Sequence, residues 1–328
     1  GAFTTPALVR RFGVNKTMVW LLALLFVAIA ARPYLGFIGL IIGTTLAGLA
    51  IAVANVLLPT VVRARFPKKV VPLTAGYTTL LAASASFAAA FSYPSAAQFG
   101  WQIALELWAL PALLALGLSL TLLGGKSDTA QGAPEEHSGD FKLISRSPIA
   151  WSIIGLFGIQ SLGFYALLAW LPNFAIDSGM NPADAGALLS LMTVVGVPVG
   201  LVLSSNFGRF NNLAPVGAVI SLVTIAGLVL LLMHLWVPAV IVIGIGQASS
   251  FPLSLSLIST RAGNQRLTTM LSSVSQGVGY LLAAGGTFLF GWLAKVTGNW
   301  QVSVIGLIAL TCIQVVAAWY AGRPQVIR

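Results

Sequence analysis

The side chains of this protein that could bind a small molecule are amides, hydroxyls and phenols set inside long apolar stretches. Asn55 and Gln247 each carry a carboxamide, which offers two donors and an acceptor to a ligand. A polar group in such a stretch is costly unless it faces a cavity, water or a protein partner. Amides at these positions indicate either ligand contacts or hydrogen bonds between helices, and the residues alone leave both interpretations open.

Further polar side chains recur at helical spacing. Ser161 and Tyr165 lie four residues apart, with Gln160 adjacent. Gln276 lies on a stripe of hydroxyl-bearing and small residues, and Tyr77 follows a glycine. Aromatic walls with a few donors suit a flat, weakly polar ligand such as an azole, or a short linear anion. We therefore predict a ligand site built from Asn55, Tyr77, Gln160, Ser161, Tyr165, Gln247 and Gln276.

Two ionisable residues are candidates for proton coupling or for guiding an anion. Glu106 is the one carboxylate inside an apolar stretch, where a raised pKa would let it load and unload a proton. It also lies about 7.5 Å of helix rise beyond Trp101, so it could instead reach the lipid headgroups. Arg32 ends the first stretch and could attract an anion by its field or extend to the headgroups.

The elements that must position these groups are membrane-spanning helices. The chain is 58% hydrophobic and 7% charged, whereas a soluble domain carries roughly a quarter charged residues. Strands are excluded because an open sheet edge cannot satisfy its backbone in lipid and no barrel-type alternation is present. The sequence predicts an all-α integral membrane protein with about ten spans. They cover residues 14–31, 36–60, 70–93, 99–123, 148–173, 182–205, 213–233, 236–260, 267–293 and 299–321.

The basic residues predict the orientation of these spans. If the spans alternate in direction, fifteen of the seventeen Lys and Arg residues fall on one side, and only Arg32 and Lys295 fall on the other. Such an excess in short loops marks the cytoplasmic side. The net charge of +10 is then a matter of topology and does not predict nucleic-acid binding. We expect a multi-pass protein of the inner (plasma) membrane whose C-terminus is cytoplasmic.

Residues for catalysis or metal binding are scarce. The chain has two histidines and one cysteine, Cys312, in an apolar stretch where we expect a small buried thiol. No nucleophile, acid pair or metal cluster can be assembled from this set. We therefore predict no enzyme activity, no metal and no cofactor.

The chain divides into two related halves. Residues 124–147 are rich in Gly and Ser and lack apolar periodicity, which predicts a cytoplasmic linker between an N-terminal bundle over 1–123 and a C-terminal bundle over 148–328. Phe12-Gly13 recurs as Phe207-Gly208, and Asn55 has a counterpart in Gln247, at offsets of 195 and 192 positions. This parallel repeat predicts four plus six helices of an expected six plus six, with two helices absent before Gly1. It also favours ligand contacts for Asn55 and Gln247.

The sequence resembles the family of cyanate permeases and 2-nitroimidazole transporters within the major facilitator superfamily. The stretches that carry the resemblance are GLAIAVANVLLPTVVRARFP (48–67), AGYTT (75–79), RSPIAW (146–151), IQSLGFYALLAWLP (159–172), SQGVGYLLAA (275–284) and GNW (298–300). The resemblance implies the major facilitator fold in two pseudo-repeat bundles. It also implies transport of a small nitrogenous anion or nitroheterocycle by alternating access.

Other functions remain open at this point. The chain could be a non-transporting truncated fragment, or a facilitator-fold transporter of an unrelated small organic compound or drug. A channel would differ by turnover that does not saturate with substrate. The expected partners are a small-molecule substrate, membrane lipid and protons, with the protein acting as a monomer.

Overall fold

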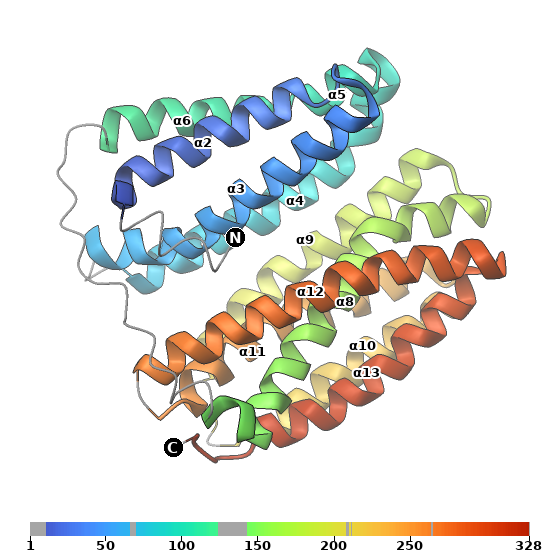
Figure 1. Ribbon diagram of the computed structural model, residues 1–328. Helices are drawn as coiled ribbons and strands as arrows, with labels where there is room; N and C mark the ends of the chain where they lie inside the picture. Colours follow the sequence, from blue (N-terminus) through green and yellow to red (C-terminus); the bar gives the residue numbers. More distant parts are fainter. Residues whose placement is uncertain are drawn as a thin grey trace. The chain divides into compact units, whose positions relative to one another are not determined.

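The computed structural model describes residues 11–65, 70–123, 143–207, 210, 212–263 and 265–327, which form long helices (Figure 1). The chain separates into two compact units, one of residues 1–78 and 91–135 and one of residues 79–90 and 136–328. Residues 124–142 of the predicted linker lie outside the described part.

The first unit contains α2 (Val14–Ala31), α3 (Gly36–Arg65), most of α4 (Val70–Phe99), α5 (Trp101–Glu106) and α6 (Ala109–Leu123). Consecutive long helices run in alternating directions (Figure 1). α2 packs against both α3 and α6. Its contact with α3 encloses a small core, which includes Met18, Leu21, Ala50, Val53 and Leu57.

The predicted fourth span is divided at a proline. α5 ends at Glu106 and α6 begins at Ala109. Pro111 has no backbone N–H with which to reach the carbonyl of Leu107. That carbonyl instead accepts from the N–H of Leu110 at 3.2 Å, a tighter turn that interrupts the α-helix.

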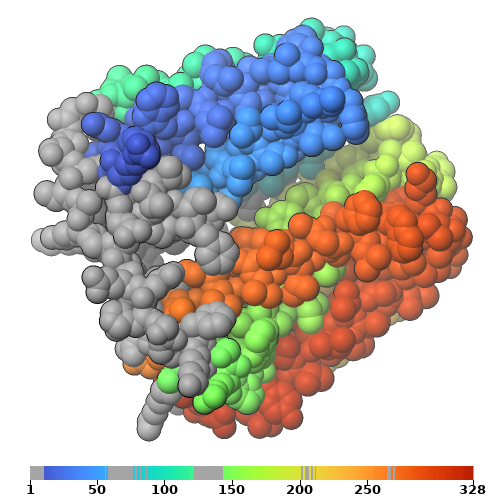
Figure 2. All heavy atoms as spheres, viewed as in Figure 1, coloured from blue at the N-terminus to red at the C-terminus, as the bar shows by residue number. Residues whose placement is uncertain are grey.

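The second unit contains α8 (Pro148–Asp177), α9 (Pro182–Asn206), α10 (Ala214–Leu232), α11 (Trp236–Arg261), α12 (Gln265–Thr297) and α13 (Trp300–Gly322). α8 begins where Ser147 accepts a hydrogen bond from the N–H of Ala150 and Pro148 occupies the first turn. It then packs against α9, α11, α12 and α13. α12, α8 and α13 lie side by side on one face of this unit (Figure 2).

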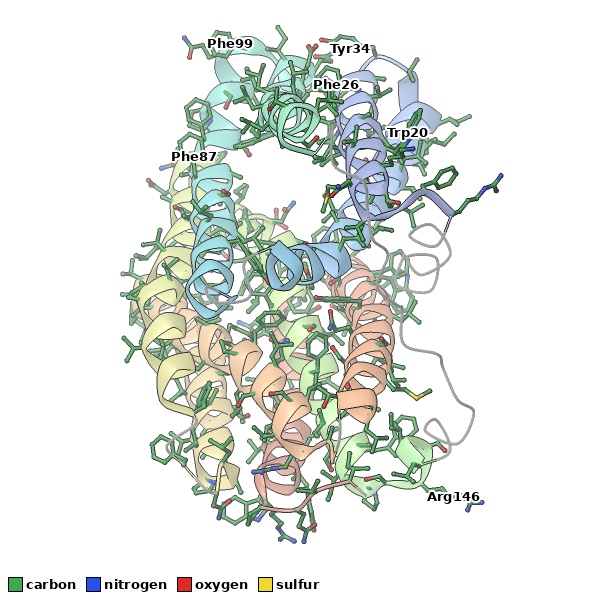
Figure 3. The ribbon with its side chains drawn as sticks, turned by 90° about the vertical axis from the view of Figure 1, so that its left-hand side faces the viewer. Trp20, Phe26, Tyr34, Phe87, Phe99 and Arg146 are labelled. Atoms are coloured by element: carbon green, nitrogen blue, oxygen red, sulfur yellow. The ribbon has the colours of Figure 1, made fainter. Side chains whose placement is uncertain are left out.

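The composition of these helices fits a lipid environment. Nine stretches of the described residues are long and apolar enough to cross a membrane, and α4 adds a 30-residue helix without a charged side chain. Large apolar side chains are exposed on their surfaces, among them Trp20 and Phe87 at 70% and 58% (Figure 3). Cys312 is also exposed, on the face of α13 that carries Ile305 and Val316. The prediction of a buried thiol was therefore wrong, because an apolar stretch in a membrane helix need not face protein.

Glycines let the helices of the second unit approach closely. A Cβ on Gly244 of α11 would lie 2.4 Å from the backbone oxygen of Met192 in α9. A Cβ on Gly158 of α8 would lie 3.4 Å from the Cα of Gly279 in α12. Small residues at such crossings are what lets membrane helices pack without a hydrophobic driving force between them.

The end of α13 is held by a buried cation. The guanidinium of Arg261 donates to the carbonyl of Gly322 at 2.9 Å and to that of Ala321 at 3.4 Å. A cation at a helix C-terminus satisfies its last carbonyls and interacts favourably with the helix dipole. This contact connects the ends of α11 and α13.

The close contact at Gly244 gives a test of the packing. Gly244→Ala should destabilise the chain by about 1–3 kcal/mol, because the new methyl group has no room against the backbone of α9. Gly285→Ala is the matched control, since nothing lies within 4 Å of a Cβ there, and it should leave stability unchanged or raise it. Thermal unfolding of the two variants in detergent compares them. Equal effects on both would show that the α9–α11 crossing is looser than described.

Candidate ligand-binding site

Three predicted polar residues come together inside the second unit. Gln160 and Ser161 of α8 and Gln247 of α11 are all buried, and Gln160 donates through Nε2 to the hydroxyl of Ser161 at 2.8 Å. Gln247 lies against Gly163, one helical turn beyond Gln160: a Cβ on that glycine would be 3.1 Å from Gln247 Nε2. The missing side chain of Gly163 therefore makes room for the amide.

The carbonyl oxygen of Gln247 is the unusual atom of this group. It is buried and has no hydrogen-bond partner in the structure. Burying such an acceptor without a partner costs about 1–3 kcal/mol. Gln314 of α13, another buried amide, donates instead to the hydroxyls of Ser221 and Ser250 at 3.2 and 3.5 Å. A ligand that donates a hydrogen bond would therefore satisfy the carbonyl oxygen of Gln247.

Aromatic rings of α8, α11 and the neighbouring α12 lie close to one another. The ring of Tyr280 in α12 lies 6.3 Å from that of Tyr165 and 5.5 Å from that of Phe157, both in α8. Phe157 is also 6.0 Å from Phe251 of α11. Tyr165, Tyr280 and Phe251 are each about two-fifths exposed, so these rings present accessible surface beside the buried amides. Such a mixture of ring faces and a few polar groups suits a flat ligand.

Gln276 stands at the edge of this group on α12. It is half-buried, and its Nε2 donates to the hydroxyl of Ser272 at 2.8 Å. It lies one turn before Tyr280, with its amide already partly satisfied within its own helix. Gln276 therefore has fewer unsatisfied hydrogen-bonding groups to offer a ligand than Gln247 has.

Asn55 and Tyr77 belong to the first unit. Asn55 is exposed on α3, on a face shared with Thr44, Gly48 and Ala52, all exposed as well. Tyr77 is half-buried on α4. The structure therefore places five predicted residues in the second unit, which are Gln160, Ser161, Tyr165, Gln247 and Gln276, and the remaining two, Asn55 and Tyr77, in the first.

The two ionisable candidates lie at the turn where α2 meets α3 and at the end of α5. Tyr34 donates through its hydroxyl to Glu106 Oε2 at 2.6 Å. Tyr34 is labelled in Figure 3 at one end of the first unit. Arg32 is half-buried, with its Cβ 2.5 Å from where a Cβ on Gly43 would be, and its buried Nε has no hydrogen-bond partner. Burial lowers the pKa of Arg32.

The described part of the chain contains no group of three or more His, Cys, Asp and Glu residues that could hold a metal ion.

Tyr280 and Phe251 were not predicted from the sequence, although a signal for both was present. Each follows a polar residue by four positions, Tyr280 after Gln276 and Phe251 after Gln247, just as Tyr165 follows Ser161. Residues four apart share a helix face. A repeated amide or hydroxyl with an aromatic ring one turn later would have identified both positions.

Known proteins resemble most of this chain. The model of the Major Facilitator Superfamily matches residues 1–279. The 2-nitroimidazole transporter of Escherichia coli (strain K12) is 33% identical over 329 residues, covering 97% of this chain and 81% of that protein. The cyanate transport protein CynX of the same organism is 28% identical over 281 residues, covering 81% and 71%.

A solved structure has a similar fold. The crystal structure of a D-xylose-proton symporter superposes with a TM-score of 0.74 at 16% identity, and the match covers 100% of this chain and 84% of the symporter. At this identity the likeness concerns the fold.

The contact between Tyr34 and Glu106 predicts a pH dependence. The hydrogen bond to Glu106, partial burial and the negative charge of Glu106 together raise the pKa of Tyr34 above its ordinary value of 10. The folded state therefore favours the protonated phenol, so this contribution to stability is fully present below pH 10 and is lost as the pH rises through the raised pKa. Glu106→Gln should lower the pKa of Tyr34 towards 10.

The phenolate absorbance of the chain, with that of a Tyr34→Phe variant subtracted, isolates this titration from those of the other tyrosines. The same subtraction is made in the Glu106→Gln background. A midpoint that does not move between the two backgrounds would show that the contact does not form in solution.

Proposed function

The chain belongs to the major facilitator superfamily, and from this premise we propose that it transports a small nitrogen-containing anion or nitroheterocycle by alternating access. It is a multi-pass membrane protein of a family of transporters. The substrate class is the proposal, with Gln160, Ser161, Tyr165, Gln247 and Gln276 as contacts in the second unit and Asn55 and Tyr77 as contacts from the first.

The observation that carries the substrate class is the unpartnered carbonyl of Gln247. A buried acceptor is completed by a ligand that donates a hydrogen bond. The N–H of an azole ring supplies such a donor, and the amide N–H₂ of the same side chain can donate back to a nitro group. Cyanate is an acceptor only and would leave this oxygen unpaired. Of the two chemistries, the nitroheterocycle fits Gln247 better.

The rings of Tyr165 and Tyr280 support the same class. Aromatic pairs gain about 0.5–1.5 kcal/mol beyond the burial of their area. A planar heterocycle beside these tyrosines gains from such contacts, whereas a linear triatomic anion has little surface with which to do so. The functions of the two relatives, 2-nitroimidazole and cyanate transport, give independent support for small nitrogen compounds.

The remaining roles are proposed with this function. Glu106 is the candidate for binding and releasing a proton, and Arg32, with its buried and unpartnered Nε, is the candidate for attracting an anion. The protein would act as a monomer in the inner membrane, with the basic ends of its helices in the cytoplasm.

A pair of buried amides gives the test of the site. Gln247→Leu should weaken the binding of 2-nitroimidazole by tenfold or more, because both hydrogen bonds of the amide are lost. It should not destabilise the unliganded chain, since it removes an unpaired acceptor. Gln314→Leu is the control: it leaves the hydroxyls of Ser221 and Ser250 without this donor and should destabilise the chain without changing affinity.

Ligand-dependent thermal stabilisation measures both quantities, because a ligand that binds only the folded state raises its stability with concentration. 2-Nitroimidazole and cyanate are compared on the parent chain and on each variant. Undiminished 2-nitroimidazole affinity in Gln247→Leu would remove this residue from the site. If neither compound stabilises the chain, the proposed substrate class is wrong.

A further inference from the structure

A hollow lies at one end of the second unit, far from the buried amides. It has a volume of about 680 Å³ and forms where α8 and α12 end and α13 begins, with His234 from the turn between α10 and α11 at its edge. Asp177 at this end of α8 is about 25 Å of helix from Gln160. The hollow is therefore separate from the site around Gln160, Ser161 and Gln247, which is called the central site from here on.

Three aromatic rings form its wall. Trp170, Phe174 and Trp300 all line the hollow. The ring of Trp300 lies 5.8 Å from that of Trp170 and is stacked on Phe174 at 6.1 Å. Both indole N–H groups are engaged by protein: that of Trp170 donates to the carbonyl of Thr287 at 2.9 Å, and that of Trp300 to Asp177 Oδ2 at 2.8 Å. The rings are thus fixed in place before any ligand arrives.

Charges of both signs face the same hollow. Asp177 and Lys295 both line it, and both are exposed. The ammonium group of Lys295 can donate to an acceptor group on a ligand. The carboxylate of Asp177 has a second oxygen beyond the one that holds Trp300, and this oxygen can accept from a ligand N–H. The hollow therefore offers one donor and one acceptor beside a wall of aromatic rings.

His234, at the edge of the hollow, has a backbone conformation that glycine normally adopts. Its φ is 56°, and the N–H of Leu235 donates back to the carbonyl of Leu230 at 3.0 Å, which is the arrangement of a helix end closed by a left-handed residue. A side chain there carries a backbone cost that glycine would avoid. The imidazole packs edge-on against Phe174 and Trp236, at 5.8 and 5.4 Å. It completes the aromatic wall at the mouth of the hollow.

We propose that this hollow, named here the end site and made of Trp170, Phe174, Asp177, His234, Lys295 and Trp300, binds a planar aromatic heterocycle that carries one N–H and one acceptor group. The end site lies at the start of α13, at Trp300, whereas Arg261 contacts the other end of this helix, at Gly322. By the distribution of basic residues it faces the outside, where it would hold a substrate molecule before or after the central step. The choice of ligand class rests on the proposed function, while the existence of the end site rests on its own geometry.

Counting bound ligand distinguishes the two sites. Equilibrium dialysis of 2-nitroimidazole against the detergent-solubilised chain should give two saturable sites per chain. Gln247→Leu should remove one of them and leave the other. Adding Lys295→Gln should weaken the remaining site by about tenfold, whereas Lys16→Gln, which replaces an exposed lysine of the first unit, should not. Cyanate, which has no ring, should not compete at the end site.

His234→Gly separates binding from folding. It relieves the positive φ, so the fold should be as stable as the parent or close to it, but it removes a ring from the wall and should weaken the end site. A purely structural histidine would leave ligand affinity unchanged.

The remaining outcomes overturn one of the two proposals or both of them. If the parent binds one molecule and Gln247→Leu abolishes it, the end site is wrong and the central site stands. If a single site is lost with Lys295→Gln and kept in Gln247→Leu, the end site stands and the central assignment is wrong. The absence of saturable binding in every variant overturns both.

Discussion

The low polarity of the membrane interior makes an unpaired polar group costly, and most of this structure follows from that constraint. Helices satisfy their own backbones, and hydroxyls inside them bond to the preceding turn: Ser221 and Ser250 donate to carbonyls four residues earlier at 3.0 and 2.9 Å. The amide of Gln314 is satisfied in turn by these two hydroxyls. Among the described residues, the exceptions are the carbonyl oxygen of Gln247, the hydroxyls of Ser275 and Thr287 and the Nε of Arg32. The carbonyl oxygen of Gln247 is the exception that lies in the candidate ligand site, and it is therefore informative about ligands.

The packing of the helices determines where an unpaired buried amide such as that of Gln247 can lie. Gly163 leaves room for the amide of Gln247, and the contact between Gly158 and Gly279 brings α8 and α12 near enough for Tyr165 and Tyr280 to approach each other. A larger residue at any of these glycines would separate the helices and increase the distances between the residues of the site. The same small residues that allow helices to associate in lipid thus also set the size of the ligand site.

The sequence predicted the helices well because the length of an apolar run is set by the membrane itself. The first span was predicted over 14–31, and α2 covers Val14–Ala31. Membership of the major facilitator superfamily confirms the predicted fold class. The break before Pro111 was missed because hydropathy does not register a single absent N–H. Gln160, Ser161 and Gln247 could be proposed as ligand contacts from the sequence because polar atoms stand out in apolar runs. Tyr280 and Phe251 were not proposed because aromatic rings are ordinary in such runs. Which face a residue presents depends on neighbouring helices that composition cannot place, as Cys312 illustrates.

α8 carries residues of both the central site and the end site. Bending of α8 therefore decides whether a ligand in one site changes the geometry of the other. Gln160 and Ser161 lie near its middle, and Asp177 lies at its end. Pro172 stands between them and cannot donate to the carbonyl one turn earlier, so the helix lacks one internal bond at that point. Helices bend at such positions more readily than elsewhere. Packing of Trp170 against Gly291 holds α8 to α12 just before this point. A ligand that draws Asp177 and Lys295 together would therefore act on the segment beyond Pro172, while the amides before it keep their contacts.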